Sequence, residues 1–173
     1  FGGCIRSLES VINGRQIQWT LPRSMNKTGG LALEIIPGQR VPGDFANKKY
    51  HLSVLEPKRK IRVSRTENGG PLGGLRVNKT FTLDKDALKI DVDLELVNTG
   101  ANTISTSCRV QNILVGSDGF FTAPTRDWLQ AFHKTNESIQ TTNALNSDNL
   151  QFGWLAKTTP DAAVVFAFHL PDI

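Results

Sequence analysis

Apolar and polar residues alternate along two neighbouring segments of the chain, residues 75–84 and 88–98. Because successive side chains of a β-strand point to opposite faces, this period of two predicts two strands, each with one face on a core. The apolar set comprises Leu75, Val77, Phe81, Leu83, Leu88, Ile90, Val92, Leu94 and Leu96. Lys79 falls in the same phase as this set, so either a bulge shifts the register there or a lysine points inward.

Most of the remaining chain also has strand character, interrupted by glycine, proline and asparagine. Asn13 and Gly14 predict a tight turn between two strands within residues 3–21. Further strands are predicted at residues 31–36, 50–57, 60–66, 103–115, 150–158 and 162–170. One short amphipathic helix is expected within residues 126–134, where Trp128, Leu129 and Phe132 would share a face. About ten strands and at most one short helix are typical of an all-β fold, and we expect an antiparallel β-sandwich.

Length and composition indicate one domain over residues 1–173, since a chain of this size can bury a single core. Hydrophobic residues make up 39 % of the chain, and no apolar run approaches the roughly 20 residues that span a bilayer. The sequence starts at Phe1 with neither an initiator methionine nor a signal-like stretch. A mature product, a trimmed chain and a fragment of a longer protein are therefore alternatives that stay open.

A cluster of basic residues stands out against a mild net charge of +4. It lies within eight positions and comprises Lys58, Arg59, Lys60, Arg62 and Arg65. Such a cluster is typical of an edge strand, where charge discourages aggregation of sheets. The alternative is a patch that meets an anionic sugar, a phospholipid or nucleic acid. Nucleic acid is not expected as a partner, because no aromatic residues for base stacking are interleaved with the charges.

The residue types that carry catalysis or bind metals are scattered. No nucleophile-elbow, zinc-protease or phosphate-loop motif occurs, and no spacing of the three histidines and two cysteines suggests a metal site. Asp91, Asp93 and Glu95 share the polar face of one predicted strand, where they would form its solvent side or, alternatively, bind calcium. Cys4 and Cys108 lie in apolar surroundings that suit small buried thiols, although a disulfide stays open. We therefore predict no catalytic residue, no metal site and no cofactor.

A small ligand site is predicted from four residues on one strand and the loop after it. Arg109 and Gln111 share the polar face of their predicted strand, whose opposite side, with Cys108 and Val110, suits the core. Arg126 and Trp128 lie in a polar stretch that could fold over the polar face. Arginine and glutamine offer directional hydrogen bonds to sugar hydroxyls, and an indole offers an apolar surface. The alternative is structural, with Arg109 paired to a neighbouring carboxylate and Trp128 closing the end of the sandwich.

Three segments together resemble the galactose-mutarotase-like supersandwich superfamily. The opening resembles "GGxIxSLxxxxNGxxIxW" and is carried by Gly2, Gly3, Ile5, Ser7, Leu8, Gly14 and Trp19. The middle, residues 74–100, resembles "GLRVxKTFTLxxxxLxIxVxLxLxNTG", and a late "GWLA" strand is followed by "AAVVFAF". The resemblance covers most of the chain and implies a β-sandwich that is associated with carbohydrate or purely structural.

Two branches of that superfamily differ in the function they imply. Sugar epimerases carry a general-acid histidine in a strand similar to "TxHxYFN", whereas this chain has Gln111 near that place. Glutamine cannot exchange a proton at neutral pH, so a non-catalytic, carbohydrate-associated domain is implied. The periplasmic domain of YidC-family membrane-protein insertases is the second branch that residues 77–100 resemble. It implies an exported or periplasmic interaction module whose basic cluster lies near anionic lipid or meets a protein partner.

Overall fold

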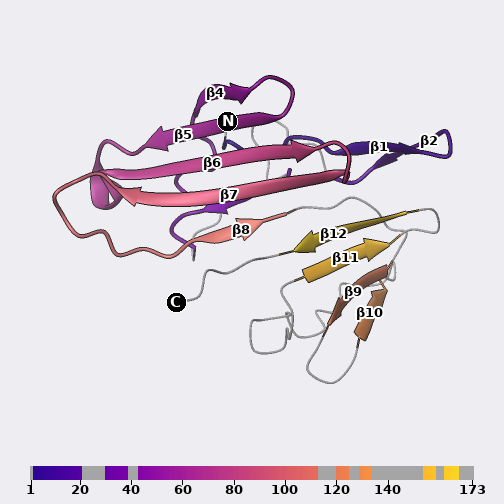
Figure 1. Cartoon of the computed structure of the whole chain (residues 1–173). Coiled ribbons are helices and arrows are strands. Elements are labelled where there is room, and N and C mark those ends of the chain that lie inside the picture. Colours follow the sequence, from indigo (N-terminus) through magenta and orange to yellow (C-terminus); the bar gives the residue numbers. More distant parts are fainter. Residues whose placement is uncertain are drawn as a thin grey trace. The chain divides into compact units, whose positions relative to one another are not determined.

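The computed structural model describes residues 2–20, 30–38, 43–112, 120–124, 129–133, 154–158 and 162–167. The chain divides into two compact units (Figure 1). Unit 1 comprises residues 1–8 and 20–114, and unit 2 comprises residues 9–19 and 115–173. Each unit is described by itself, and the single domain expected over residues 1–173 stays a prediction.

A four-stranded antiparallel sheet forms the larger part of unit 1. Its strands follow chain order as β4 (His51–Glu56), β5 (Lys60–Thr66), β6 (Leu75–Asp84) and β7 (Lys89–Asn98). Successive antiparallel neighbours need only short connections, and these are the turn after Glu56, the 3-10 helix η1 (Gly70–Leu72) and the turn after Asp84. The two longest strands are the hairpin predicted from the alternating pattern of residues 75–98.

The register of this sheet explains the place of Lys79. Strand β6 pairs with both neighbours without a shift, and Lys79 stands between Val63 of β5 and Leu94 of β7. No bulge interrupts β6, so Lys79 keeps its apolar phase and points to the inner face, where it is buried. Of the two alternatives that the sequence left open, the structure has the inward lysine.

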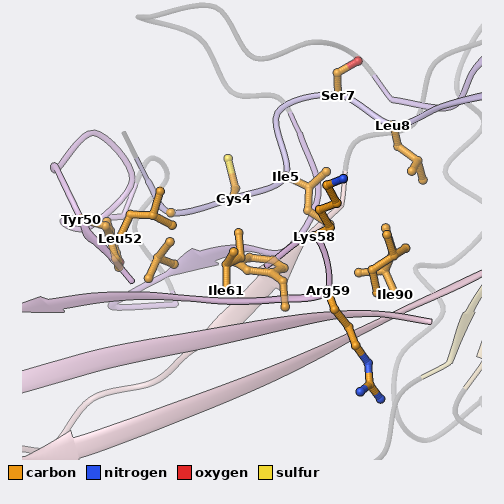
Figure 2. A pocket seen from close by; sticks show the side chains of 14 residues that line it. Cys4, Ile5, Ser7, Leu8, Tyr50, Leu52, Lys58, Arg59, Ile61 and Ile90 are labelled. Atoms are coloured by element: carbon orange, nitrogen blue, oxygen red, sulfur yellow. The ribbon is translucent and has the colours of Figure 1, made fainter. Parts of the chain in front are cut away.

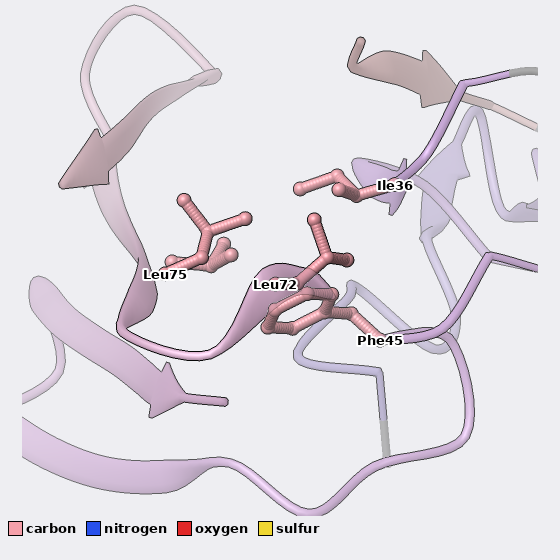
Figure 3. Close-up of a cluster of buried hydrophobic side chains, with 5 residues drawn as sticks. Ile36, Phe45, Leu72 and Leu75 are labelled. Atoms are coloured by element: carbon pink, nitrogen blue, oxygen red, sulfur yellow. The ribbon is translucent and has the colours of Figure 1, made fainter. Parts of the chain in front are cut away.

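A second pair of strands, β3 (Leu33–Ile35) and β8 (Arg109–Gln111), also belongs to unit 1. The main hydrophobic cluster joins the residues that follow β3 to the start of β6, and Figure 3 labels four of its members. Ile36 and Phe45 are fully buried there against Leu72, Leu75 and Val77. Burying an aromatic or branched side chain stabilises by about 1.5–3 kcal/mol, so this cluster fixes β3 and residues 43–50 on the inner face of the sheet.

Unit 2 contains a hairpin and a second antiparallel sheet. The hairpin pairs β1 (Glu9–Ile12) with β2 (Arg15–Gln18), and its turn has positive φ at Asn13 and Gly14, as the asparagine–glycine pair predicts. The sheet has the order β10-β9-β11-β12. These strands are β9 (Phe120–Pro124), β10 (Leu129–His133), β11 (Trp154–Thr158) and β12 (Ala163–Ala167).

The all-β class with antiparallel sheets is confirmed, and three local predictions are corrected. The short helix expected within residues 126–134 is wrong over Leu129–His133, which form strand β10 against β9. A helix this short is marginal alone, so pairing with a neighbouring strand decides its structure. No strand was predicted over Phe120–Pro124, which form strand β9. Of the strand expected over residues 103–115, residues 103–112 are described, and within them only Arg109–Gln111, which pair with β3, form a strand.

Candidate functional site

A buried ionic network lies on the inner face of the sheet in unit 1. The Lys79 ammonium is 1 % exposed and donates to the backbone carbonyls of Gly2 and Ala32, each at 3.0 Å. It also forms an ion pair with the fully buried carboxylate of Glu34. The hydroxyl of Tyr50 donates to the other oxygen of that carboxylate. All three ammonium hydrogens therefore have an acceptor, which compensates the cost of removing both charges from water.

The three side chains of this network come from three separate segments of the chain. Glu34 lies in the middle of β3, Lys79 lies in the middle of β6, and Tyr50 directly precedes β4. The Tyr50 ring also lies under the ammonium, 5.3 Å from Nζ to the ring centroid, which is a cation–π geometry. Gly3 has φ +47° and packs against Tyr50, where an added Cβ would come within 3.0 Å of the ring. Glycine therefore permits this close approach.

Burial and the nearby carboxylate change the acidity of two neighbouring groups. Burial, followed by the charge of Glu34 and its hydrogen bond, raises the pKa of Tyr50 far above its ordinary value. Burial and then the Glu34 charge also raise the pKa of the Cys108 thiol, while Lys79 opposes that shift. A thiol with a raised pKa is a poor nucleophile at neutral pH. Cys4 and Cys108 are reduced thiols rather than a disulfide.

The network is closed to solvent and internally neutral, so it joins β3 to β6 rather than presenting a reactive group. Glu34 was not among the residues that the sequence singled out. A signal was present, since Glu34 is the only charge in the apolar segment of residues 31–36 and Lys79 is the only charge in the apolar phase of its strand. Two opposite charges, each isolated in an apolar strand, indicate a buried pair.

A pocket of about 570 Å³ lies on the same inner face of unit 1, toward the end formed by the β4–β5 turn (Figure 2). Its walls come from residues 3–8 and from all four strands of the sheet. The lining is mostly apolar and includes Ile5, Leu8, Tyr50, Leu52, Ile61, Val63, Phe81, Leu83 and Ile90. Lys58 and Arg59 are its two cationic residues. A volume of this size accommodates a small apolar ligand or a few side chains of a partner.

The side chains of the two cationic pocket residues, Lys58 and Arg59, point in different directions. Ile5 and Lys58 both line the pocket, whereas in Figure 2 Arg59 extends away from the other labelled side chains. Arg59 makes an exposed ion pair of 3.1 Å with Glu56, which is the residue three positions before it. Lys58 is exposed and has a left-handed backbone, with φ 62°. Lys58 is thus the cation that the pocket presents to a ligand.

The side chains of the predicted basic cluster do not lie together on one surface. Strand β5 is an interior strand between β4 and β6, so the expectation of an edge strand is wrong. The edge strand on this side of the sheet is β4, which pairs with β5. Arg62 points to the outer face toward the Thr80 hydroxyl, while Arg65 donates to Glu67 and to the Lys49 carbonyl. Lys60 and Arg62 therefore lie apart from Lys58 at the pocket.

The predicted ligand residues are only partly described. Arg109 is exposed and Gln111 is half-buried, and both lie on β8. The Gln111 Oε1 atom is buried and accepts no hydrogen bond from the described residues. The opposite side, expected to be core, holds half-buried Cys108 but also Val110, which is 47 % exposed. The expectation for Val110 is wrong because β8 pairs on one side only, with β3, among the strands described. Arg126 and Trp128 lie outside the described residues.

The described part of the chain contains neither a metal-binding cluster nor a membrane-spanning helix. Within it, no group of three or more histidine, cysteine, aspartate or glutamate residues is placed to hold a metal ion. None of the helices described there is long and apolar enough to cross a membrane. The exposed carboxylates of β7 are separated along the strand, with Asp91 paired to Lys89 at 2.8 Å and Glu95 accepting from Asn78 at 2.7 Å.

Comparisons with known proteins add no assignment. No model of a known protein family matches the chain, and no curated protein or solved structure matches it either.

Proposed function

We propose that this chain is a non-catalytic interaction module of the mutarotase-like supersandwich type, as the resemblance to the periplasmic domain of YidC-family insertases implies. Its pocket in unit 1 would bind an apolar group that carries an anionic substituent. An exported or periplasmic location is part of this proposal, as is a partner that is a protein segment or a lipid.

The observation that supports this function is the contrast between two features of one sheet face. The ionisable groups that could act on a substrate, Glu34 and Lys79, are buried and neutralise each other. The open feature is instead a pocket with apolar walls and an exposed lysine. Apolar walls supply affinity through burial, and one cation at the mouth selects the sign of the ligand charge.

A matched pair of dyes tests the pocket. Anilinonaphthalene sulfonate and N-phenyl-1-naphthylamine share an aromatic skeleton, but only the first carries a sulfonate. We expect Lys58→Glu to weaken binding of the sulfonate dye about three- to tenfold, because an exposed attraction becomes a repulsion. Binding of the neutral dye should change less than about twofold. Fluorescence titration of purified protein measures both affinities.

Two further variants make the result specific. Lys85→Glu makes the same charge change in the β6–β7 turn, outside the pocket lining, and should leave both dyes unaffected. Leu52→Ser removes an apolar wall that is 57 % exposed, so it should weaken both dyes while the protein stays folded. If neither Lys58→Glu nor Leu52→Ser changes dye binding, the pocket does not bind such ligands and the proposal fails.

A carbohydrate-associated function is the second candidate, and one observation favours it. The buried Oε1 atom of Gln111 accepts no hydrogen bond from the described residues, and the exposed Arg109 shares its strand face. A buried acceptor without a donor is costly, and a sugar hydroxyl would supply that donor. Arg126 and Trp128 would complete this site under the same proposal.

A glycan panel tests the carbohydrate candidate. We expect the wild-type chain to bind at least one glycan, and Arg109→Ala and Trp128→Ala each to weaken that binding about tenfold, as the loss of a charged hydrogen bond or a stacking surface predicts. Arg6→Ala removes an exposed arginine outside the site and serves as the control. Absence of glycan binding, or binding that neither substitution weakens, would remove this candidate.

A further inference from the structure

Strand β7 forms one edge of the four-stranded sheet in unit 1. In the sheet order β4-β5-β6-β7, β7 pairs with β6 alone among the strands described. It is ten residues long, and its register with β6 is continuous from Lys89 to Asn98. An edge strand offers a row of backbone donors and acceptors that another extended chain can pair with.

The two edges of this sheet are protected differently. Strand β4 at the opposite edge has six residues, and its register shifts between Val54 and Glu56. A short strand with a bulge is a poor template for further pairing. Strand β7 has neither a bulge nor a proline, so its edge is regular over its whole length. Such an edge suits the docking of an extended segment.

The two faces of β7 define the chemistry of such a segment. One face carries Ile90, Val92 and Leu96, which are 37 %, 39 % and 40 % exposed. The other face carries the carboxylates of Asp91, Asp93 and Glu95. A strand added at this edge would place alternate side chains beside each row. Apolar side chains on one face and basic side chains on the other would complement β7.

The outer face of the sheet carries basic residues on β5 and acidic residues on β7, with β6 between them. The register places Lys60 of β5 opposite Thr82 of β6, which is opposite Asp91 of β7. Arg62, Thr80 and Asp93 form the next row in the same way. In these two rows the outer face thus runs from basic through neutral to acidic. A further strand at the β7 edge would meet three carboxylates, with Lys89, which pairs with Asp91, at the start of the same face.

A second copy of this chain is a poor occupant of the edge. If two β7 strands paired with their apolar rows on the same face, both acidic rows would share the other face. Like charges that stand opposite each other across two strands are destabilising. The carboxylates therefore oppose self-association while favouring a segment of opposite charge.

We propose that the β7 edge binds an extended segment of a partner protein that carries lysine or arginine at alternate positions with valine or isoleucine between them. The segment adds a fifth strand to the sheet through backbone hydrogen bonds. Its basic side chains pair with Asp91, Asp93 and Glu95. This interaction surface is separate from the proposed function of the pocket, to which β7 contributes only Ile90.

A synthetic peptide tests the proposal on the whole chain. The probe is the capped peptide KVRVKVRG, and its affinity is measured by isothermal titration calorimetry. We expect D91N/D93N to weaken binding at least about twofold, since each opposite-charge pair across strands contributes roughly a factor of 1.4 to 5. The double variant E56Q/D86N removes the same charge from unit 1 outside β7 and should change the affinity less than about 1.5-fold.

Two further measurements separate strand addition from a general attraction of charges. The peptide KKRRVVVG has the same composition without alternation and should bind at least about fivefold more weakly. Of two KVRVKVRG analogues, each N-methylated along one edge, at least one should lose binding, because methylation removes the backbone donors. Hydrogen–deuterium exchange of amides in residues 89–98 should slow when the parent peptide binds.

Several results would overturn the proposal. It fails if KVRVKVRG does not bind, or if D91N/D93N and E56Q/D86N weaken the peptide equally. It also fails if both N-methylated analogues bind as well as the parent, since the contact then uses charge without backbone pairing. Unchanged exchange in residues 89–98 would likewise exclude β7 as the docking strand.

Discussion

Replacing Lys79 by methionine is expected to destabilise unit 1 by about 3–5 kcal/mol, the range for removing one partner of a buried ion pair. The Glu34 carboxylate would stay fully buried without its ammonium partner, and the carbonyls of Gly2 and Ala32 would each lose a donor. Urea unfolding followed by far-UV circular dichroism measures the change. Unit 1 contains no tryptophan, so tryptophan fluorescence follows unit 2 in the same experiment.

Lys89→Met is the matched control for this prediction. Lys89 also pairs with a carboxylate, Asp91, at 2.8 Å, but its side chain is 60 % exposed. Exposed pairs contribute little to stability because water screens them, so this variant should unfold close to wild type. If Lys79→Met also unfolds within about 1 kcal/mol of wild type, the ion pair of Lys79 and Glu34 is not the buried contact described above.

The double variant Glu34→Met with Lys79→Met separates the loss of the pair from the loss of one partner. Replacing both charges by apolar side chains of similar size leaves no buried charge and is often neutral or stabilising in other buried pairs. We expect the double variant to recover at least half of the stability that Lys79→Met loses. Equal losses in the single and double variants would indicate that side-chain packing, rather than the stranded carboxylate, sets the cost.

The second prediction with a large effect concerns Tyr50, the only tyrosine of the chain. Burial and the adjacent Glu34 carboxylate raise its pKa far above the ordinary value, so its hydroxyl should stay protonated while unit 1 is folded. At pH 11 a tyrosine with an ordinary pKa of about 10 is roughly nine-tenths ionised. We expect less than about one-tenth tyrosinate at that pH. Absorbance near 295 nm measures tyrosinate, and Tyr50→Phe supplies the blank.

The raised pKa of Tyr50 also predicts how stability depends on pH. Above pH 10 the unfolded chain releases the phenolic proton while the folded chain keeps it, so unfolding becomes more favourable as the pH rises. The contribution of Tyr50 is therefore fully present below about pH 10 and decreases above it. Tyrosinate should appear together with the loss of the circular dichroism signal. A reversible titration near pH 10 in folded protein would contradict the contact of Tyr50 with Glu34.

The sequence by itself determined the strands whose pattern is local. Alternation over residues 75–98 places β6 and β7, and the pair Asn13 and Gly14 places the turn of β1 and β2. These features follow from the pleat of a strand and from the backbone freedom of turn residues, which act within a few positions along the chain. Alternation also placed Lys79 in the apolar phase of its strand. That left two alternatives, a bulge in the strand or a lysine that points inward.

Only the tertiary structure decided which of these strands are neighbours and what their side chains meet. Lys79 is buried because Glu34 reaches it from a strand 45 residues earlier, and alternation contains no information about that distance. The same holds for β5, which became an interior strand, and for Leu129–His133, which became a strand through pairing with β9. A period along the chain determines which face a residue occupies, but the partner on that face depends on contacts between segments far apart in sequence.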